Sequence, residues 1–229
     1  MLTLQELDAI RLSMIVGATA VAGSLPFGIA LGWLLARYSF PGKTIVETLL
    51  NLPLVLPPVV TGYLLLATLG RQGWLGGLLD RTFGIRFVFD WKGAAVAAAV
   101  VSFPLMVRAI RLAFAAIDHQ LEQAARTLGA SRIDAFMTVS LPLARPGIVA
   151  GCVLAFARSM GEFGATIMIA GNIPGMTQTI PLYIYEQLSV PGGLEASRRI
   201  VIVSVVIAAA ALMAGEYLDR RGRLRLRAD

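Results

Sequence analysis

The sequence is poor in the residues that build metal, redox and acid–base sites. Its 229 residues include one cysteine, Cys152, and one histidine, His119. One thiol cannot form an intrachain disulfide, and no CxxC, HExxH or carboxylate cluster is present. These absences exclude a disulfide scaffold and a His-rich metal site. They also leave little from which a catalytic centre could be assembled, which argues against a membrane-embedded enzyme.

Charged residues are scarce as well. They make up 15% of the chain while hydrophobic residues make up 57%, compared with about 25% and about 45–50% in soluble domains. A water-soluble fold of this length could not cover so much apolar surface, so the expected solvent is lipid. Because no polar linker interrupts the chain, we predict one transmembrane domain over residues 10–217, followed by a basic cytoplasmic tail, 218–229.

Five segments are long and apolar enough to cross a bilayer, which takes roughly 20 residues. The first is too long for a cleaved signal peptide and its acidic N-terminal flank has the wrong charge for one. The sequence therefore predicts an all-α, polytopic membrane helix bundle. The segments are 10–36, 45–69, 93–110 with an end that could reach Ala116, 146–170 and 200–217.

The orientation follows from the lysines and arginines of the loops, because cytoplasmic loops carry more of them. One set of loops holds 12 such residues, in 37–44, 108–145 and the tail, and the other set holds 7. This bias predicts an N-terminus outside and a C-terminus in the cytoplasm. The same bias explains the net charge of +6, so nucleic-acid binding is not needed to account for it.

Prolines interrupt several of the predicted spans. A proline removes a backbone donor and clashes with the preceding turn, and membranes tolerate this where neighbouring helices or a wet cavity satisfy the freed carbonyls. The run Leu52–Pro58 contains three prolines. It is either a kink used for packing or a segment that lines a pathway, with Pro57, Pro58 and Thr61 as candidate lining residues.

The stretch 118–147 has helical periodicity between two spans. One apolar face is predicted, with a single charged member, from Leu121, Ala125, Leu128, Arg132, Phe136 and Val139. Asp118 can cap the first helix, and Gly129 permits a sharp turn or the close approach of another backbone. We predict a cytoplasmic helix–turn–helix that docks into a soluble partner.

This stretch resembles the signature of ABC-importer permeases: E-A-A, three residues, G, nine residues, I, one residue, L-P. Two positions depart from it, where glutamine replaces the acid and valine replaces isoleucine. Glu122, one position earlier, could substitute for the missing acid. The matching residues are Gln123, Ala124, Ala125, Gly129, Val139, Leu141 and Pro142.

Further segments are similar to the molybdate/sulfate branch of these permeases; they are Ser24–Gly28, Leu52–Val60, Ser102–Arg111 and Phe156–Thr166. The resemblance implies a type I permease of the bacterial inner membrane that forms a homodimer. It further implies two cytoplasmic ATPase subunits, which the 118–145 loop would contact, and an external oxyanion-binding protein. The expected ion is molybdate, with sulfate, thiosulfate or tungstate as alternatives.

The chain itself is expected to bind no cofactor. It lacks the GxxxxGK[ST] phosphate loop, so ATP and Mg would belong to the partner subunit. An ion-coupled secondary transporter is a rival interpretation, but no internal repeat of the kind many such transporters have is visible.

Two charged residues, Arg158 and Glu162, fall inside the fourth predicted span. They lie four residues apart and so share a helix face, and intramembrane charges are usually paired or functional. They form either a structural pair or a gate, and Arg158 could meet an oxyanion in transit. Ser159 and Thr166 are further candidates for lining the pathway. In the outer loop, 180–188 is too short to span and predicts an interfacial or re-entrant helix.

Overall fold

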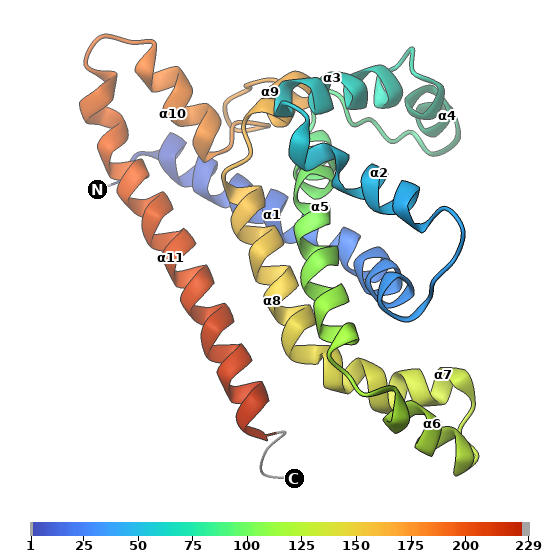
Figure 1. Cartoon of the computed structure of the whole chain (residues 1–229). Coiled ribbons are helices and arrows are strands. Elements are labelled where there is room, and N and C mark those ends of the chain that lie inside the picture. The colour runs from blue at the N-terminus through green and yellow to red at the C-terminus, as the bar shows by residue number, and fades with distance from the viewer. Residues whose placement is uncertain (1, 226–229) are drawn as a thin grey trace.

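The computed structural model describes residues 2–225, which are helical with no strand among them (Figure 1). The all-α prediction is confirmed. The helices are α1 (Leu4–Arg37), α2 (Lys43–Val55), α3 (Pro58–Leu69), α4 (Trp74–Phe83), α5 (Trp91–Ala115), α6 (His119–Thr127), α7 (Arg132–Ala135), α8 (Leu141–Met160), α9 (Gly164–Ala170), α10 (Ile180–Leu188) and α11 (Gly193–Arg225), with a π-helical segment, η1 (Phe136–Ser140), between α7 and α8.

Among residues 2–225, four helical runs could each cross a membrane by length and composition, and the number is five if the bent pair α2–α3 forms one span. The straight runs are α1, α5, the α7–η1–α8 run from Arg132 to Met160, and Gly193–Gly215 of α11. Capping residues determine where two of these helices begin. Thr3 and Glu6 form a capping box at the start of α1, and the Asp90 side chain accepts a hydrogen bond from Lys92 N at the start of α5. The prediction of a helix bundle with about five apolar spans is thus confirmed at the level of four or five spans.

The second span is broken where the sequence concentrates its prolines. Helices α2 and α3 meet at 112°. Leu56 is extended, with φ −67° and ψ 141°, because the residue before a proline is forced out of the helical region. Pro57 then precedes the first turn of α3, where Pro58 fits because no backbone donor is needed there.

The fourth span differs from the prediction at both ends. The 146–170 segment is not one helix: α8 ends at Met160 and the chain restarts as α9 at Gly164. On the cytoplasmic side the run begins at Arg132, because α7 and η1 lead into α8 without a loop. Hydropathy averaged over a whole span did not locate either end, because the apolar residues on both sides of Arg158 and Glu162 outweigh these two charges.

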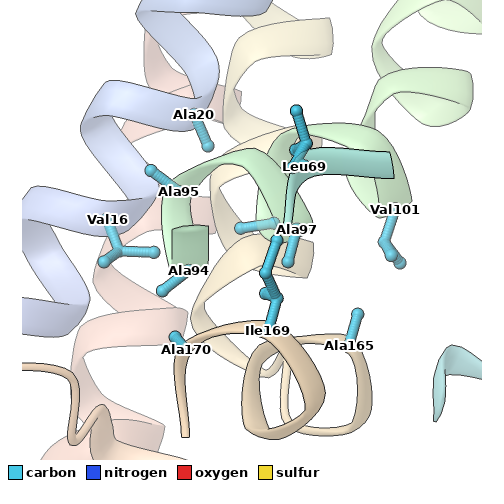
Figure 2. Packing of buried hydrophobic residues seen from close by; sticks show 11 residues of the cluster. Val16, Ala20, Leu69, Ala94, Ala95, Ala97, Val101, Ala165, Ile169 and Ala170 are labelled. Carbon is cyan, nitrogen blue, oxygen red and sulfur yellow. The ribbon is translucent and has the colours of Figure 1, made fainter. Parts of the chain in front are cut away.

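A cluster of small side chains lies where α1, α5 and α9 meet (Figure 2). Several of its members are alanines with no exposed surface, among them Ala94, Ala97 and Ala165. Lipid is as apolar as a side chain, so helices in membranes associate by close van der Waals packing, which small residues allow. Helix α5 is the centre of the bundle and packs against α1, α8 and α9.

Glycines bring two other helix pairs into backbone contact. A Cβ added to Gly62 of α3 would lie 2.7 Å from the backbone of Ala165 in α9, and one on Gly164 would lie 2.8 Å from Pro58. A Cβ on Gly147 of α8 would lie 2.3 Å from Ala113 of α5. The broken second and fourth spans are therefore fitted to each other through α3 and α9.

The end of the molecule that carries α6 and α7 also carries the end of α11 (Figure 1). The C-terminal end of α1 lies there too, because Arg37 donates a hydrogen bond to Ile117 O just before α6. The loops expected in the cytoplasm thus gather at one end. Helix α11 continues to Arg225, inside the predicted tail, and residues 226–229 lie outside the described residues.

Candidate coupling element and transport pathway

The predicted helix–turn–helix between the third and fourth spans is present as α6 and α7. The Asp118 side chain caps α6 by accepting a hydrogen bond from Gln120 N, as expected. Ser131 and Asp134 form a capping box that starts α7. Both helices project from the end of the bundle (Figure 1).

Gly129 supports the turn through its backbone conformation. Its φ is +98°, a region that side-chain-bearing residues rarely adopt. Apart from its chain neighbours, no atom of residues 2–225 lies within 4 Å of the position its Cβ would occupy. Of the two roles predicted for Gly129, the sharp turn is confirmed, and no close backbone approach occurs within this chain.

The expected single apolar face is divided in two by that turn. Phe136 points into the bundle, where its ring lies 5.2 Å from that of Trp33 and 6.0 Å from that of Phe114. Leu121, Leu128 and Arg132 are exposed instead. The prediction of one continuous face was wrong, because a change of direction at Gly129 rotates the second helix relative to the first.

The outward part of this element is an apolar surface, which we call the docking surface. Leu128 is 89% exposed, and Leu121, Ile133 and Met137 are exposed as well. Exposed apolar side chains gathered on one element are a common feature of interaction surfaces. Of the signature residues, Gln123, Ala124 and Pro142 are exposed, while Ala125 and Leu141 are half-buried.

Glu122 points away from that surface. Its carboxylate accepts a hydrogen bond from Ser140 Oγ and lies 3.6 Å from Arg37 Nη2. The expectation that Glu122 replaces the outward acid of the signature is therefore not supported by this geometry. The spacing of residues in the sequence could not predict that Glu122 contacts Arg37 and Ser140, because these three residues belong to three separate helical elements.

The intramembrane charges form the predicted pair. Arg158 Nη1 lies 2.9 Å from Glu162 Oε2, and Glu162 Oε1 accepts a hydrogen bond from Ala165 N in the first turn of α9. The side chain of Glu162 is 2% exposed and that of Arg158 is 30% exposed. Glu162 thus joins the end of α8 to the start of α9, while part of the Arg158 guanidinium stays open to the surroundings.

The hydroxyls expected to line a pathway are buried within the single chain. Thr61, Ser159 and Thr166 have almost no exposed surface. Ser159 Oγ donates to Ala155 O at 2.8 Å, which satisfies it locally. Pro57 and Pro58 are exposed. The three hydroxyls therefore do not line an open path in one subunit, whereas the proline break does reach the surface.

A cavity of about 960 Å³ lies between α1, α2 and α5. Its lining is almost wholly apolar, with Phe27, Leu49 and Phe103 among its walls. A hydrated dianion would lose most of its water there and find few donors in return, since the polar lining residues are Thr19, Ser24 and Lys92. The cavity is therefore not an oxyanion site.

Apolar spans, two of them broken, and a projecting docking element define a membrane-embedded permease subunit. The chain belongs to the family of binding-protein-dependent transport system inner membrane components, whose model matches residues 28–223. It is 55% identical over 224 residues to the molybdenum transport system permease protein ModB of Escherichia coli, covering 98% of each chain. It is 37% identical over 209 residues to the sulfate transport system permease protein CysT of Salmonella typhimurium, covering 91% of this chain and 74% of that one.

The fold also matches solved transporters. One is a bacterial alginate ABC transporter in complex with an alginate pentasaccharide-bound periplasmic protein, with a TM-score of 0.74 at 18% identity, covering 96% of this chain and 80% of that chain. At this identity the likeness shows the fold alone. The chain thus has the fold of an ABC-importer membrane subunit, and it is a permease subunit, not an enzyme, as predicted.

Proposed function

We propose that this chain is the transmembrane permease subunit of an ATP-driven importer for molybdate. The observation that carries the proposal is the 55% identity to a molybdenum permease over 98% of both chains. Sulfate or thiosulfate is the second candidate, favoured by the 37% identity to a sulfate permease. Tungstate is a third, since it has the charge and shape of molybdate. An ion-coupled secondary transporter is the least favoured class.

The energy for transport comes from a partner that hydrolyses ATP. The chain has no phosphate loop, so ATP and Mg are bound by a cytoplasmic ATPase subunit. The docking surface supports this partnership, because Leu121, Leu128, Ile133 and Met137 need an apolar groove to cover them. The 118–145 loop would lie in such a groove and transmit the closure of two ATPase subunits.

The importer contains two copies of this chain in the bacterial inner membrane, together with an external oxyanion-binding protein. The path would run between the two copies. Two observations support this arrangement: the polar groups Thr61, Ser159 and Thr166 are occluded inside each chain, and the break at Pro57–Pro58 is exposed. Rigid-body movement of the copies would then open the path to either side of the membrane in turn.

The proposal is tested by uptake into proteoliposomes that contain the permease, its ATPase and the binding protein. We expect ATP-dependent accumulation of molybdate in preference to sulfate, and no accumulation with a proton or sodium gradient alone. Preference for sulfate would reassign the ion while leaving the class intact. Uptake that follows an ion gradient and ignores ATP would contradict the class.

A further inference from the structure

Glu122 lies where three elements meet at the docking end of the bundle. Its carboxylate accepts a hydrogen bond from Ser140 Oγ in η1. Its Oε1 lies 3.6 Å from Nη2 of Arg37, in the last turn of α1, and its Oε2 lies 4.0 Å from Nδ1 of His119. The Glu122 side chain is 16% exposed and that of Arg37 is 10% exposed. An acid in a helix that would face the cytoplasm is therefore turned inward and almost covered.

Helix α6 has few other attachments to the membrane domain. None of its nine residues is buried. Its neighbours in the chain are the short connection through Ile117 and the turn at Gly129. Beside the packing of α6 on η1 and α7, the partly buried Glu122 side chain provides the polar contacts that hold the docking surface against the bundle.

The segment that Glu122 contacts is unusual in itself. In η1 the α-helical hydrogen-bonding pattern is interrupted between α7 and α8, and π-helical turns of this kind are frequent at functional sites. Along the chain, α7 is connected to the transmembrane helix α8 through this segment. The bridge from Glu122 to Ser140 connects α6 to the end of η1 directly, next to the first residue of α8.

Arg37 needs the charge of Glu122. Its Nη1 donates to Ile117 O at 3.1 Å, but its buried Nε and Nη2 make no hydrogen bond within residues 2–225. A covered guanidinium without a counter-charge is strongly destabilising. Glu122 supplies that counter-charge, 3.6 Å from Nη2.

We propose that Glu122 is the positioning residue that couples the docking surface to the membrane domain. It joins α6 to α1 through Arg37 and to the start of α8 through Ser140, so that the three elements move as one body. The proposal rests on the function proposed above and deepens it. It assigns Glu122 an internal role and leaves contact with the ATPase to the outward residues of the loop.

The test measures coupling separately from docking. Glu122→Gln removes the charge and keeps a side chain that can bond Ser140, and Ser140→Ala removes the hydrogen bond alone. The double variant Arg37→Gln/Glu122→Gln leaves no unpaired charge, which keeps the test valid if the single Glu122 variant fails to fold. Glu47→Gln is the matched control: it breaks the Arg111–Glu47 pair of 2.9 Å between α5 and α2, which has no contact with α6.

Each variant is assembled with its ATPase in proteoliposomes, and molybdate uptake and ATP hydrolysis are measured together. We expect Glu122→Gln and the double variant to copurify with the ATPase and hydrolyse ATP, while uptake per ATP falls at least fivefold, the lower end of typical coupling energies. Ser140→Ala should give a smaller loss in the same direction. Glu47→Gln should keep the parent ratio.

Two results would overturn the proposal. One is a ratio of molybdate uptake to ATP hydrolysis that is the same in both Glu122 variants as in the unmodified protein. The other is loss of ATPase binding in a correctly inserted Glu122→Gln subunit, which would place the carboxylate at the partner interface. Failure of the parent itself to use ATP would instead refute the proposed function, so the two failures are distinguishable.

Discussion

Replacement of Gly129 tests whether the turn between α6 and α7 determines docking. The residue has φ +98° and nothing within 4 Å of its Cβ position. The cost of a side chain there is therefore conformational, not steric, and amounts to about 1–3 kcal/mol for a residue held in a sparsely populated region. One or two kcal/mol changes a population by a factor of about 5–30. We expect Gly129→Ala to weaken association with the ATPase by a factor of that order.

A series of substitutions at Gly129 tests the conformational argument more strictly than one variant. Asparagine tolerates left-handed conformations better than alanine, and valine is branched at Cβ, so affinity should fall in the order Gly, Asn, Ala, Val. Gly23 is the matched control, because it also has open space around its Cβ position but lies within α1 at an ordinary φ. Gly23→Ala should leave ATPase binding unchanged and be slightly stabilising, by about 0.5–1 kcal/mol.

The assay is the dissociation constant of the detergent-solubilised permease and its ATPase, measured with subunits shown to be folded by thermal unfolding. If Gly129→Ala binds the ATPase as tightly as the unmodified permease does, the argument that the backbone conformation at Gly129 determines docking is refuted. A normal Gly129→Ala combined with complete loss in Gly129→Val would show instead that a partner approaches this position closely.

Three further predictions concern topology, the ion and packing. With Cys152 replaced, a cysteine in the 220–229 tail should be shielded from impermeant thiol reagents in intact cells and one at Gly77 should be labelled; the reverse pattern would overturn the orientation. Calorimetric titration of molybdate, tungstate and sulfate into the transporter without its binding protein should show weak or no binding, because the described hydroxyls Thr61, Ser159 and Thr166 are buried and conduction needs weak sites; tight, molybdate-selective binding would contradict this. Gly62→Ala should lower the thermal stability of the subunit by about 1–3 kcal/mol through overpacking, because its Cβ would lie 2.7 Å from the Ala165 backbone; parent stability would show that α3 and α9 are free to separate.

Features that depend on local sequence were predictable here. The extent of α10, Ile180–Leu188, follows from an apolar stretch between proline- and glycine-rich turns. The Asp118 cap and the turn at Gly129 follow from residue types with one dominant use at those positions. The five apolar spans follow from hydropathy, which reports the solvent that each segment meets.

Features that depend on packing between distant segments were not predictable. The end of α8 at Met160 is stabilised by Glu162, whose carboxylate accepts from Ala165 N and pairs with Arg158, and no periodicity signals such a break. The inward direction of Glu122 depends on Arg37, 85 positions earlier in the chain. The burial of Thr61 and Thr166 follows from the glycine-mediated approach of α3 and α9. Each of these three features depends on how the helices are placed relative to one another, which the sequence pattern does not report.

The bend between α2 and α3 has a mechanical consequence. A straight transmembrane helix that swings at its middle must stretch or break the backbone hydrogen bonds there, and lipid offers no replacement for them. At the bend two of those bonds are already absent, because Pro57 and Pro58 supply no donors, although Leu56 N still donates to Leu52 O. A change of angle in the second span would therefore cost fewer backbone hydrogen bonds at this bend than it would in an unbroken helix. Helix α3 packs closely against α9, while α2 has no buried residue and is held to α5 by the Arg111–Glu47 pair.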